Sequence, residues 1–299
     1  MPLLSVIIPT HKRAHILRRT LEHLEAQTIR DKIEVVVVSD GHDEETEKLR
    51  TENWKLRIHF FEIPKSHQGV ARNKGVQEAK GEIILFIGDD IFLGPAACEK
   101  HLLAHMPSKD IPHPCRDAPM GRLYKASDIG HCAVLGFTTW DLSLEITKTM
   151  LWLERSGWQF GYRMLRPYAH RTIRPSIQHH FTYTSHISVP TEIAKKFPFR
   201  EDVTLYGWED IEWGMRLRHA GVQLFYEPDA HAYHHHHMTL ETSLKRMETL
   251  GQSAVEMEKI VPSMKIIPRG WKRMAYQVIS LLPTMRGRHA GAYLRGMKK

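Results

Sequence analysis

Short apolar segments rich in β-branched residues alternate with segments of helical periodicity over residues 1–90. The apolar segments are too short to cross a membrane and are typical of strands that are buried on both faces of a sheet. Strands that alternate with helices imply right-handed crossovers, so the sequence predicts an α/β fold with a mostly parallel central sheet flanked by helices. The expected strands are residues 3–10, 33–38, 56–63 and 81–87, and the expected helices lie near residues 14–24, 43–50 and 68–79.

Two adjacent acidic residues, Asp89 and Asp90, follow the strand expected at residues 81–87. Carboxylates in this position lie at the carboxyl end of a strand, where open α/β sheets bind their ligands. The two side chains need not point the same way, so one can bind a divalent cation while the other hydrogen-bonds a ribose. Hard oxygen ligands favour Mg²⁺ or Mn²⁺ as that cation. The alternative is a solvated turn that binds nothing.

A histidine-rich segment, residues 231–237, lies well inside the chain. Imidazole is a common ligand for transition metals. If the segment is extended, alternate side chains share a face, so His234 and His236 point away from the side that His235 faces. The alternative is a polar run that faces solvent without a specific role.

Taken together, the ordered motifs of the chain resemble those of the family 2 glycosyltransferases, whose nucleotide-sugar-binding fold is called GT-A. The resemblance covers roughly residues 3–237. Each piece is a weak signal alone, whereas the ordered set is specific. The matching pieces are SVIIPT at 5–10, VVVVSDG at 35–41, GVARNKG at 69–75, GEIILFIGDD at 81–90 and GWEDIE at 207–212.

The resemblance implies a nucleotide-sugar donor and a divalent cation, Mn²⁺ or Mg²⁺. It assigns the cation to Asp90 and to a histidine beyond the strand at residues 226–228, for which we choose His234 before His236. Many relatives carry Asp-x-Asp at the first acidic site, whereas this chain has Gly88 at the first position. The implied nucleotide contacts are Pro9, Thr10 and Arg13 at the base and ribose, Asp40 at the base, Arg72 near the nucleotide and Asp89 at the ribose.

A second acidic pair, Glu209 and Asp210, follows Trp208 and opens a segment of helical periodicity. Transfer of a sugar to a hydroxyl needs a base for the acceptor proton, a cation for the departing diphosphate, and a site that orients both. Asp210 is the expected base and Glu209 an acceptor contact, and the resemblance implies inversion at the anomeric carbon. The alternative is a pair of first-turn carboxylates that complement the helix dipole.

Aromatic residues beside polar groups occur at residues 135–141 and 152–162, between the two acidic sites. Sugars present CH-rich faces that stack on aromatic rings. We therefore expect Trp140, Trp158 and Trp208 to contact the acceptor. The alternative for the two segments is a core helix with aromatic anchors.

The positive charge of the chain is concentrated at its C-terminus. The net charge is +8, and the segment from residue 264 onward has nine lysines and arginines and no acidic residue. Trp271, Met274, Val278 and Leu281 recur at helical spacing in this segment, which suits an amphipathic helix on an anionic membrane. The alternative is a helix that packs on the catalytic domain and leaves its cations in water. Few aromatic residues are interleaved with these cations, so we expect no nucleic-acid partner.

The expected organisation is a GT-A catalytic domain at residues 1–237 and a helical, basic extension at residues 238–299. Within the domain, residues 1–105 form the nucleotide-binding half and residues 120–237 the acceptor-binding half. A chain of 299 residues is long enough for one such core and an appended helical piece.

The expected function is an inverting transfer from a nucleotide sugar, UDP-linked by preference, to a glycan or lipid-linked acceptor in polysaccharide biosynthesis. The expected location is the cytoplasm, at the inner face of the membrane. The alternatives are a noncatalytic nucleotide- or glycan-binding relative, and a metal-dependent hydrolase that uses the histidine run.

Overall fold

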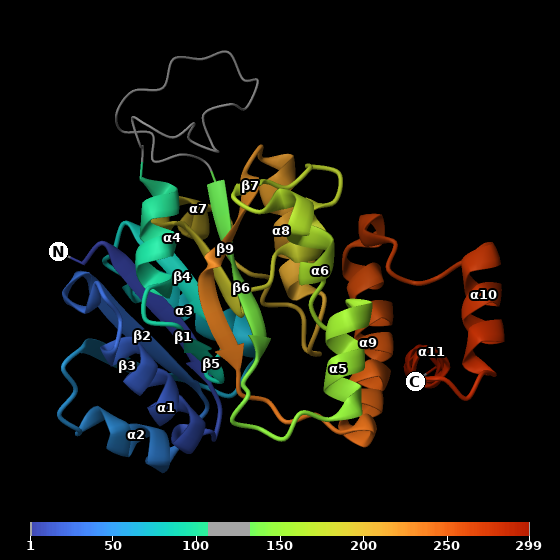
Figure 1. The fold of residues 1–299 in the computed structure, drawn as a ribbon, viewed down its shortest axis with the longest axis horizontal. Helices are drawn as coiled ribbons and strands as arrows, with labels where there is room; N and C mark the ends of the chain where they lie inside the picture. The colour runs from blue at the N-terminus through green and yellow to red at the C-terminus, as the bar shows by residue number, and fades with distance from the viewer. Residues whose placement is uncertain (1, 107–131, 299) are drawn as a thin grey trace.

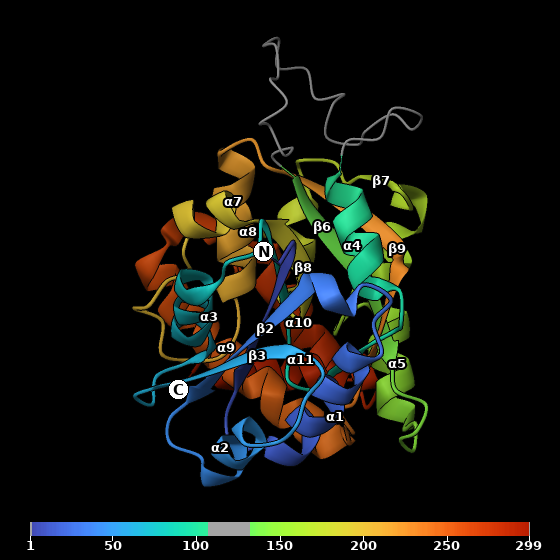
Figure 2. The ribbon, with the colours of Figure 1, turned by 90° about the vertical axis from the view of Figure 1, so that its left-hand side faces the viewer.

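A single mixed sheet organises the protein, seen in a computed structural model that describes residues 2–106 and 132–298. Within these residues the strand order is β3-β2-β1-β4-β8-β6-β9-β5, with β7 paired to β9, and helices pack on both faces (Figures 1 and 2). The predicted α/β class is confirmed. The strands are β1 (Leu4–Thr10), β2 (Ile33–Asp40), β3 (Arg57–Ile63), β4 (Ile83–Ile87), β5 (Ile91–Leu93), β6 (Cys132–Trp140), β7 (Arg171–Thr172), β8 (His186–Pro190) and β9 (Gln223–His234).

The first four strands of the sheet, β3, β2, β1 and β4, run parallel to one another. Successive side chains of β1 point to opposite faces, and both faces are buried. Ile7 packs in the cluster that includes α3, whereas Val6 and Ile8 pack in the cluster that includes α1. Burial on both sides explains why β1, β2 and β4 are largely continuous apolar runs rather than alternating ones.

The helices predicted in the N-terminal half are present with boundaries within a few residues of those expected. Helix α1 buries Leu17, Leu21 and Leu24, the positions that recur at helical spacing. The helices are α1 (Ala14–Glu25), α2 (Glu44–Arg50), α3 (Gln68–Glu78), α4 (Ala97–His105), α5 (Lys148–Ser156), α6 (Tyr162–Leu165), α7 (Thr191–Lys196), α8 (Glu209–His219), α9 (Leu240–Ile260), α10 (Gly270–Ser280) and α11 (Met285–Gly296), with short 3₁₀ turns at Arg30–Lys32, Arg166–Tyr168, Gln178–Phe181 and Pro262–Met264.

The second part of the sheet continues from β4 through β8, which runs antiparallel to it. Strand β6 pairs antiparallel with β8 and parallel with β9. The last pair in register between β6 and β9 joins Trp140 to His234. The two strand ends at which the sequence predicted site residues, those of β4 and β9, therefore lie in the same region of the sheet. The proline-rich loop expected to join the two halves, residues 106–120, lies outside the described residues except for Met106.

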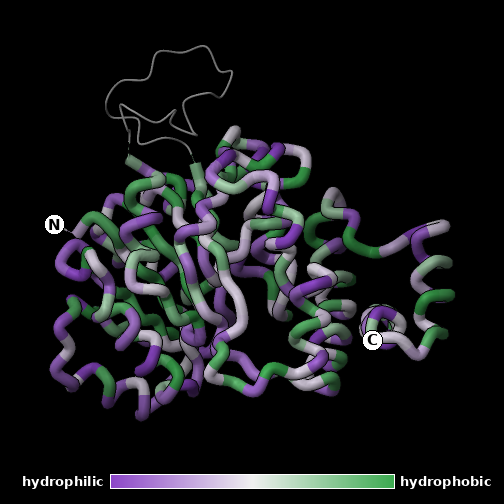
Figure 3. The backbone as a smooth tube through the Cα atoms, viewed as in Figure 1, coloured by the Kyte–Doolittle hydropathy of each residue, from purple (hydrophilic) through white to green (hydrophobic). Residues whose placement is uncertain are grey.

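The C-terminal extension consists of α9, α10 and α11, of which α11 was not predicted. An added Cβ at Gly251 of α9 would lie 2.2 Å from the backbone oxygen of Tyr293, and one at Gly296 would lie 1.9 Å from that of Glu248. These glycines let α9 and α11 pack with their backbones close together. Helix α10 stands at the edge of the molecule (Figure 1), and hydrophobic residues are present along it as well as on the central strands (Figure 3). Among the described residues, no helix combines the length and apolar composition needed to cross a membrane.

Candidate active site

A cavity of about 760 Å³ lies at the carboxyl ends of β1, β2 and β4, and residues at the start of α8 and along α9 complete its wall. It brings together twelve of the thirteen residues expected at the site, while Trp140 lies in the wall of a neighbouring cavity. The twelve that line it are Pro9, Thr10, Arg13, Asp40, Arg72, Asp89, Asp90, Trp158, Trp208, Glu209, Asp210 and His234.

Arg13 bridges the two adjacent aspartates that follow β4. Its Nη1 lies 2.8 Å from Asp89 Oδ1, and its Nη2 lies 2.8 Å from Asp90 Oδ2. Thr10 Oγ1 donates a 2.8 Å hydrogen bond to Asp89 Oδ2. Burial raises the pKa of Asp89 to about 6, although the Arg13 charge acts in the opposite direction. The two carboxylates therefore share Arg13, while the Thr10 hydrogen bond is made by Asp89.

Asp90 also faces two histidines. Its Oδ2 lies 3.4 Å from His234 Nε2 and 3.3 Å from His236 Nδ1. Burial alone would raise the pKa of Asp90, but the charge and hydrogen bonds of the histidines, together with Arg13, hold it well below its usual range. One ligand atom from each of the three side chains lies within 4.8 Å of the others, close enough to hold a single cation. One carboxylate oxygen and two imidazole nitrogens are a donor set that can hold a divalent cation.

His235 is separate from this cluster. Its Nδ1 lies 2.7 Å from Asp141 Oδ2, and its Nε2 lies 3.0 Å from Arg19 Nη1. The buried Nδ1 of His234 has no hydrogen-bond partner among the described residues, and the ring stacks on Trp140 instead. Because successive side chains of this extended segment point to opposite sides, His235 lies apart from His234 and His236.

Gly88 occupies the position where many relatives carry the first aspartate of Asp-x-Asp. A Cβ at this position would lie 3.0 Å from Asp90 Oδ1 and 3.3 Å from the side chain of Ile91. Such contacts are tighter than ordinary packing, so a larger residue would push on the Asp90 carboxylate. Glycine leaves the space that this orientation of Asp90 uses.

Asp40, at the end of β2, is held by two groups of the loop between β3 and α3. Lys65 Nζ donates to its Oδ2 at 2.5 Å, and the Ser66 backbone N–H donates to its Oδ1 at 2.6 Å. The carboxylate is nearly inaccessible to solvent and lies in the cavity wall. It is therefore a fixed acceptor at the end of the cavity that Pro9 and Thr10 also line.

The opposite wall is formed by the start of α8, which follows two residues with left-handed backbone conformation. Gly207 has φ +107° and Trp208 has φ +72°, an uncommon value for a residue with a side chain. The Trp208 indole N–H donates a 2.9 Å hydrogen bond to the backbone oxygen of Leu250 in α9. This bond holds the turn in place, and the turn presents Glu209 and Asp210 to the cavity.

The two carboxylates at this helix start differ in their partners. Gln68 donates a hydrogen bond to Glu209, which also accepts the Gly207 N–H at 3.0 Å. The Asp210 carboxylate accepts the adjacent Ile211 N–H at 2.8 Å and is not bound by Gln68. Although Asp210 is partly open to the cavity, desolvation by the surrounding protein and the nearby Glu209 raise its pKa to about 7. Asp210 is thus the carboxylate that can exchange a proton near neutral pH.

Arg72 is a buried cation between α3 and this acidic pair. Its pKa is lowered by burial, while Glu209 and Asp210 act in the opposite direction. Its Nε and Nη1 have no hydrogen-bond partner among the described residues, and Nη2 donates to Gln68 Oε1 at 3.4 Å. Gln68 was not predicted as a site residue from the sequence. Its position four residues before Arg72, on the same face of the helix, could have indicated it.

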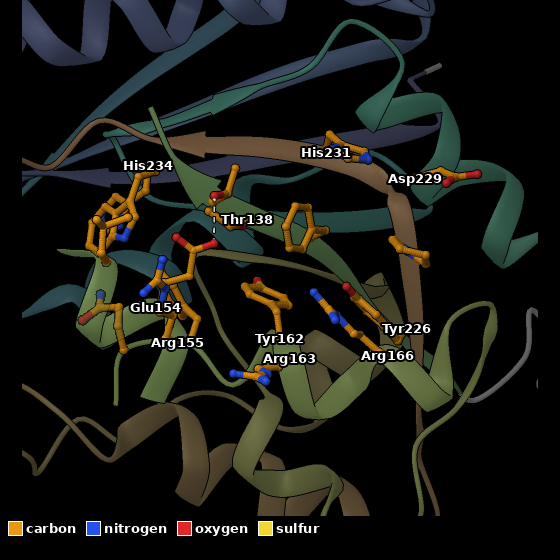
Figure 4. A pocket seen from close by; sticks show the side chains of 17 residues that line it. Thr138, Glu154, Arg155, Tyr162, Arg163, Arg166, Tyr226, Asp229, His231 and His234 are labelled. Carbon is orange, nitrogen blue, oxygen red and sulfur yellow. Dashed lines mark hydrogen bonds between the residues drawn. The ribbon is translucent and has the colours of Figure 1, made fainter. Parts of the chain in front are cut away.

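A second cavity, of about 630 Å³, adjoins the first, and Gln159, Phe160 and His234 line both. Figure 4 shows side chains that reach into it from α5, α6 and the 3₁₀ turn after α6. Its wall combines aromatic rings with cations and two acids, and it includes Phe137, Trp140, Tyr162, Tyr226, Arg155, Arg163, Arg166, Glu154 and Asp229. The guanidinium groups of these three arginines make no hydrogen bond or ion pair with the described residues.

Comparison with known proteins is consistent with this geometry. The sequence model of glycosyl transferase family 2 matches residues 5–127. EpsH of Bacillus subtilis, named as a glycosyltransferase, is 34% identical over 103 residues, which are 34% of this chain and 30% of the relative. Validoxylamine A glucosyltransferase of Streptomyces hygroscopicus is 28% identical over 244 residues, which are 75% of this chain and 53% of the relative. Residues 5–127 therefore match glycosyl transferase family 2, and the chain is similar to members of this family.

Two solved structures have a similar fold. The mannosyltransferase PcManGT of Pyrobaculum calidifontis, in complex with GDP-Man and Mn²⁺, aligns with TM-score 0.55 and 18% identity over 99% of this chain and 75% of its own. S. aureus TarS 1-349 in complex with UDP aligns with TM-score 0.53 and 16% identity over 100% of this chain and 90% of its own. The chain spans about half or less of the length of the two curated relatives.

Proposed function

We propose that the chain is an inverting glycosyltransferase that moves a sugar from a nucleoside diphosphate donor to an acceptor hydroxyl. The observation that carries the proposal is the pairing, within one cavity, of Asp210 with the cluster of Asp90, His234 and His236. Asp210 has a pKa of about 7, and the cluster has the donor set of a divalent-cation site. A base and a cation on the walls of one cavity are what this transfer requires.

The donor nucleotide is proposed to lie along Pro9, Thr10, Arg13 and Asp40. The fixed Asp40 carboxylate can accept the imide N–H of uracil, which favours a UDP sugar, and the TarS complex with UDP supports this choice. The GDP-Man complex of PcManGT supports a guanine nucleotide as the alternative. Asp89, held by Thr10 and Arg13, is proposed to hydrogen-bond the ribose.

The cation is proposed to be Mn²⁺, held by Asp90 and His234 with His236 as a third ligand. The donor atoms fit, and a structural neighbour is named as a Mn²⁺ complex. When bound, the cation stabilises the negative charge of the departing diphosphate. Arg72 adds a buried positive charge to the wall of the same cavity.

In the proposed reaction, Asp210 accepts the proton of the acceptor hydroxyl while the hydroxyl oxygen bonds to the anomeric carbon. The bond from that carbon to the diphosphate oxygen breaks, and its electron pair leaves with the nucleoside diphosphate. Attack from the side opposite the leaving group inverts the anomeric carbon. Glu209 is proposed to orient the acceptor, because Gln68 and Gly207 hold its carboxylate in place.

The acceptor is proposed to approach through the second cavity, which adjoins the first at Phe160 and His234. Its aromatic wall suits a glycan, and its unpaired arginines suit an acceptor with anionic groups. Trp158 and Trp208 line the donor cavity and are proposed to face the acceptor sugar. A lipid-linked glycan is one such acceptor, and a relative with 28% identity over 94 residues is named as acting on an undecaprenol-linked substrate.

The histidine cluster leaves a metal-dependent hydrolase as the second candidate, and titration of nucleotides separates the two. UDP, GDP and dTDP are titrated calorimetrically into the full chain with and without Mn²⁺. The transferase predicts Mn²⁺-dependent binding of one nucleotide, and release of that nucleotide from its sugar conjugate only when an acceptor is turned over. Binding of Mn²⁺ without binding of any nucleotide would favour the hydrolase.

A further inference from the structure

Helix α10 has an apolar face that nothing in the described structure covers. None of its residues is buried, and Trp271 and Leu281 are 74% and 82% exposed. Met274 and Val278 are also exposed, at positions three and seven residues after Trp271. This spacing puts the four side chains on one face of the helix, which Leu282 extends. Soluble proteins rarely expose a contiguous apolar patch of this kind without a partner.

The exposed face belongs to a unit that is packed firmly on its other side. An added Cβ at Gly287 of α11 would lie 2.1 Å from the backbone oxygen of Leu282, so the corner between α10 and α11 is tight. The rings of Tyr276 and Tyr293 lie 6.1 Å apart on the inner side of α10. The apolar face is therefore held outward by contacts on the opposite side of the helix.

The charge around this face has one sign. From residue 259 onward the sequence has no aspartate or glutamate. Arg269 pairs with Glu258, and Arg295 pairs with Glu248. No ion pair in the described structure engages the exposed cations Lys272, Arg273, Arg286 and Arg288. Cations beside an apolar helix face are the arrangement that attracts a helix to anionic lipid.

We infer that the α10 face, residues 271–282, docks on an anionic phospholipid surface, with its apolar side chains among the acyl chains and its cations at the headgroups. A second copy of the chain fits less well. A symmetric dimer places the same patch of both subunits together, which would bring unpaired cations of equal sign into one interface at a cost. A bilayer supplies both the apolar layer and the opposite charge.

The docking face is connected to the donor cavity by direct packing. Trp208 hydrogen-bonds to Leu250 of α9, and its ring lies 6.4 Å from that of Tyr293 in α11. His289 of α11 packs against both Trp152 and Trp158, and Trp158 lines the cavity. Docking through α10 thus places the active site close to the membrane. The consequence that the acceptor is lipid-linked rests on the proposed function, whereas the docking itself does not.

Co-sedimentation of the full chain with vesicles tests the inference. One set of vesicles contains phosphatidylcholine alone, and the other contains phosphatidylcholine and phosphatidylglycerol in equal amounts. The wild type is expected to bind the anionic vesicles and to lose about fivefold in affinity for each cation removed in Lys272→Gln and Arg273→Gln. The double variant Trp271→Ser, Leu281→Ser is expected to lose at least tenfold. Leu142→Ser, which alters an equally exposed leucine far along the chain, is the matched control and is expected to bind like the wild type.

Three results would overturn the inference. The first is that the Trp271→Ser, Leu281→Ser variant binds the anionic vesicles as well as the wild type does. The second is that the wild type does not bind these vesicles. The third is a wild-type dimer in light scattering that becomes a monomer in the same variant, because a second copy would then cover the face. Titration of UDP with Mn²⁺ into the variant reports on the donor site, so failure of docking and failure of the proposed transfer give different results.

Discussion

Trp140 stacks on His234 with the two ring centroids 5.3 Å apart and the ring planes 10° from parallel. The two residues are the last pair in register between β6 and β9, so the sheet itself sets this contact. The Trp140 indole N–H donates to the backbone oxygen of Met150 at 3.0 Å, which fixes the ring from its other side. Trp140 is therefore placed to orient a proposed metal ligand. The sequence analysis predicted Trp140 as an acceptor contact, and that role stays a prediction.

Trp140→Leu should weaken binding of Mn²⁺ by about 10-fold to 100-fold, the usual effect of removing a residue that orients a metal ligand. The ring of His234 would lose its stacking partner, and its Nδ1 has no hydrogen bond to hold it. Calorimetric titration of Mn²⁺ measures the effect. Trp158→Leu is the control, since Trp158 lines the donor cavity but does not contact His234. Equal Mn²⁺ affinity of Trp140→Leu and wild type would show that the stack does not position the ligand.

Arg13→Gln should strengthen binding of Mn²⁺ alone and weaken binding of the nucleotide. Arg13 Nη2 contacts Asp90 Oδ2, the oxygen that also faces both histidines. Removing this cation frees the oxygen and removes repulsion of Mn²⁺, and we expect a gain of about tenfold in affinity. Arg18→Gln, which removes an exposed arginine paired with Glu52, is the matched control. A loss of Mn²⁺ affinity in Arg13→Gln would mean that Arg13 supports the metal site rather than competing with it.

Asp210→Asn should lower the rate of transfer by about 10²-fold to 10⁴-fold while nucleotide binding persists. In the wild type, the rate should rise with pH through about 7, because the base must be deprotonated. The effect on stability has the opposite sign: a carboxyl whose folded pKa is raised costs stability once the pH exceeds its unfolded value. The variant should therefore unfold at higher urea concentration than the wild type at pH 8 and at a similar one at pH 4. An unchanged rate in the variant would exclude Asp210 as the base.

Arg72→Gln should move the pH–rate profile to higher pH. The Arg72 charge lowers the pKa of Asp210, so its removal allows that pKa to rise above about 7. Arg246→Gln is the control, because Arg246 lines the same cavity from α9 but hydrogen-bonds to Tyr206 instead. A profile that shifts equally in both variants would indicate a general effect of cavity charge.

The parts of the site that the sequence predicted are those that local pattern determines. Asp40, Asp89 and Asp90 follow apolar strands, and parallel strands bring their carboxyl ends to one edge of the sheet. Asp210 opens a helix whose turn needs Gly207. Contacts that join distant segments were not predictable in this way. The Arg13 bridge and the stack of Trp140 on His234 depend on the register of strands and on rotamers, which periodicity does not encode.

The same limit explains the missed helix α11. It contacts α9 through glycines and small residues and buries Ala290 and Ala292 rather than a stripe of large apolar side chains. Helical periodicity is read from large apolar residues, so a helix that packs by close backbone approach gives a weak signal. In α10 the stripe was visible, yet its residues are exposed. The pattern predicted the helix but did not show which surface it meets.

Two glycines of the C-terminal extension should respond in opposite ways to the same substitution. At Gly251 of α9 an added Cβ would lie 2.2 Å from the Tyr293 backbone oxygen, whereas at Gly291 of α11 the nearest atoms are 3.6 Å away. Gly251→Ala should therefore destabilise the protein by about 1–3 kcal/mol, because α9 and α11 must move apart. Gly291→Ala should stabilise it by about 0.5–1 kcal/mol, since alanine loses less entropy in a helix. Urea unfolding followed by circular dichroism measures both. Destabilisation of equal size in the two variants would mean that the close packing of α9 against α11 is not the reason why Gly251→Ala destabilises the protein.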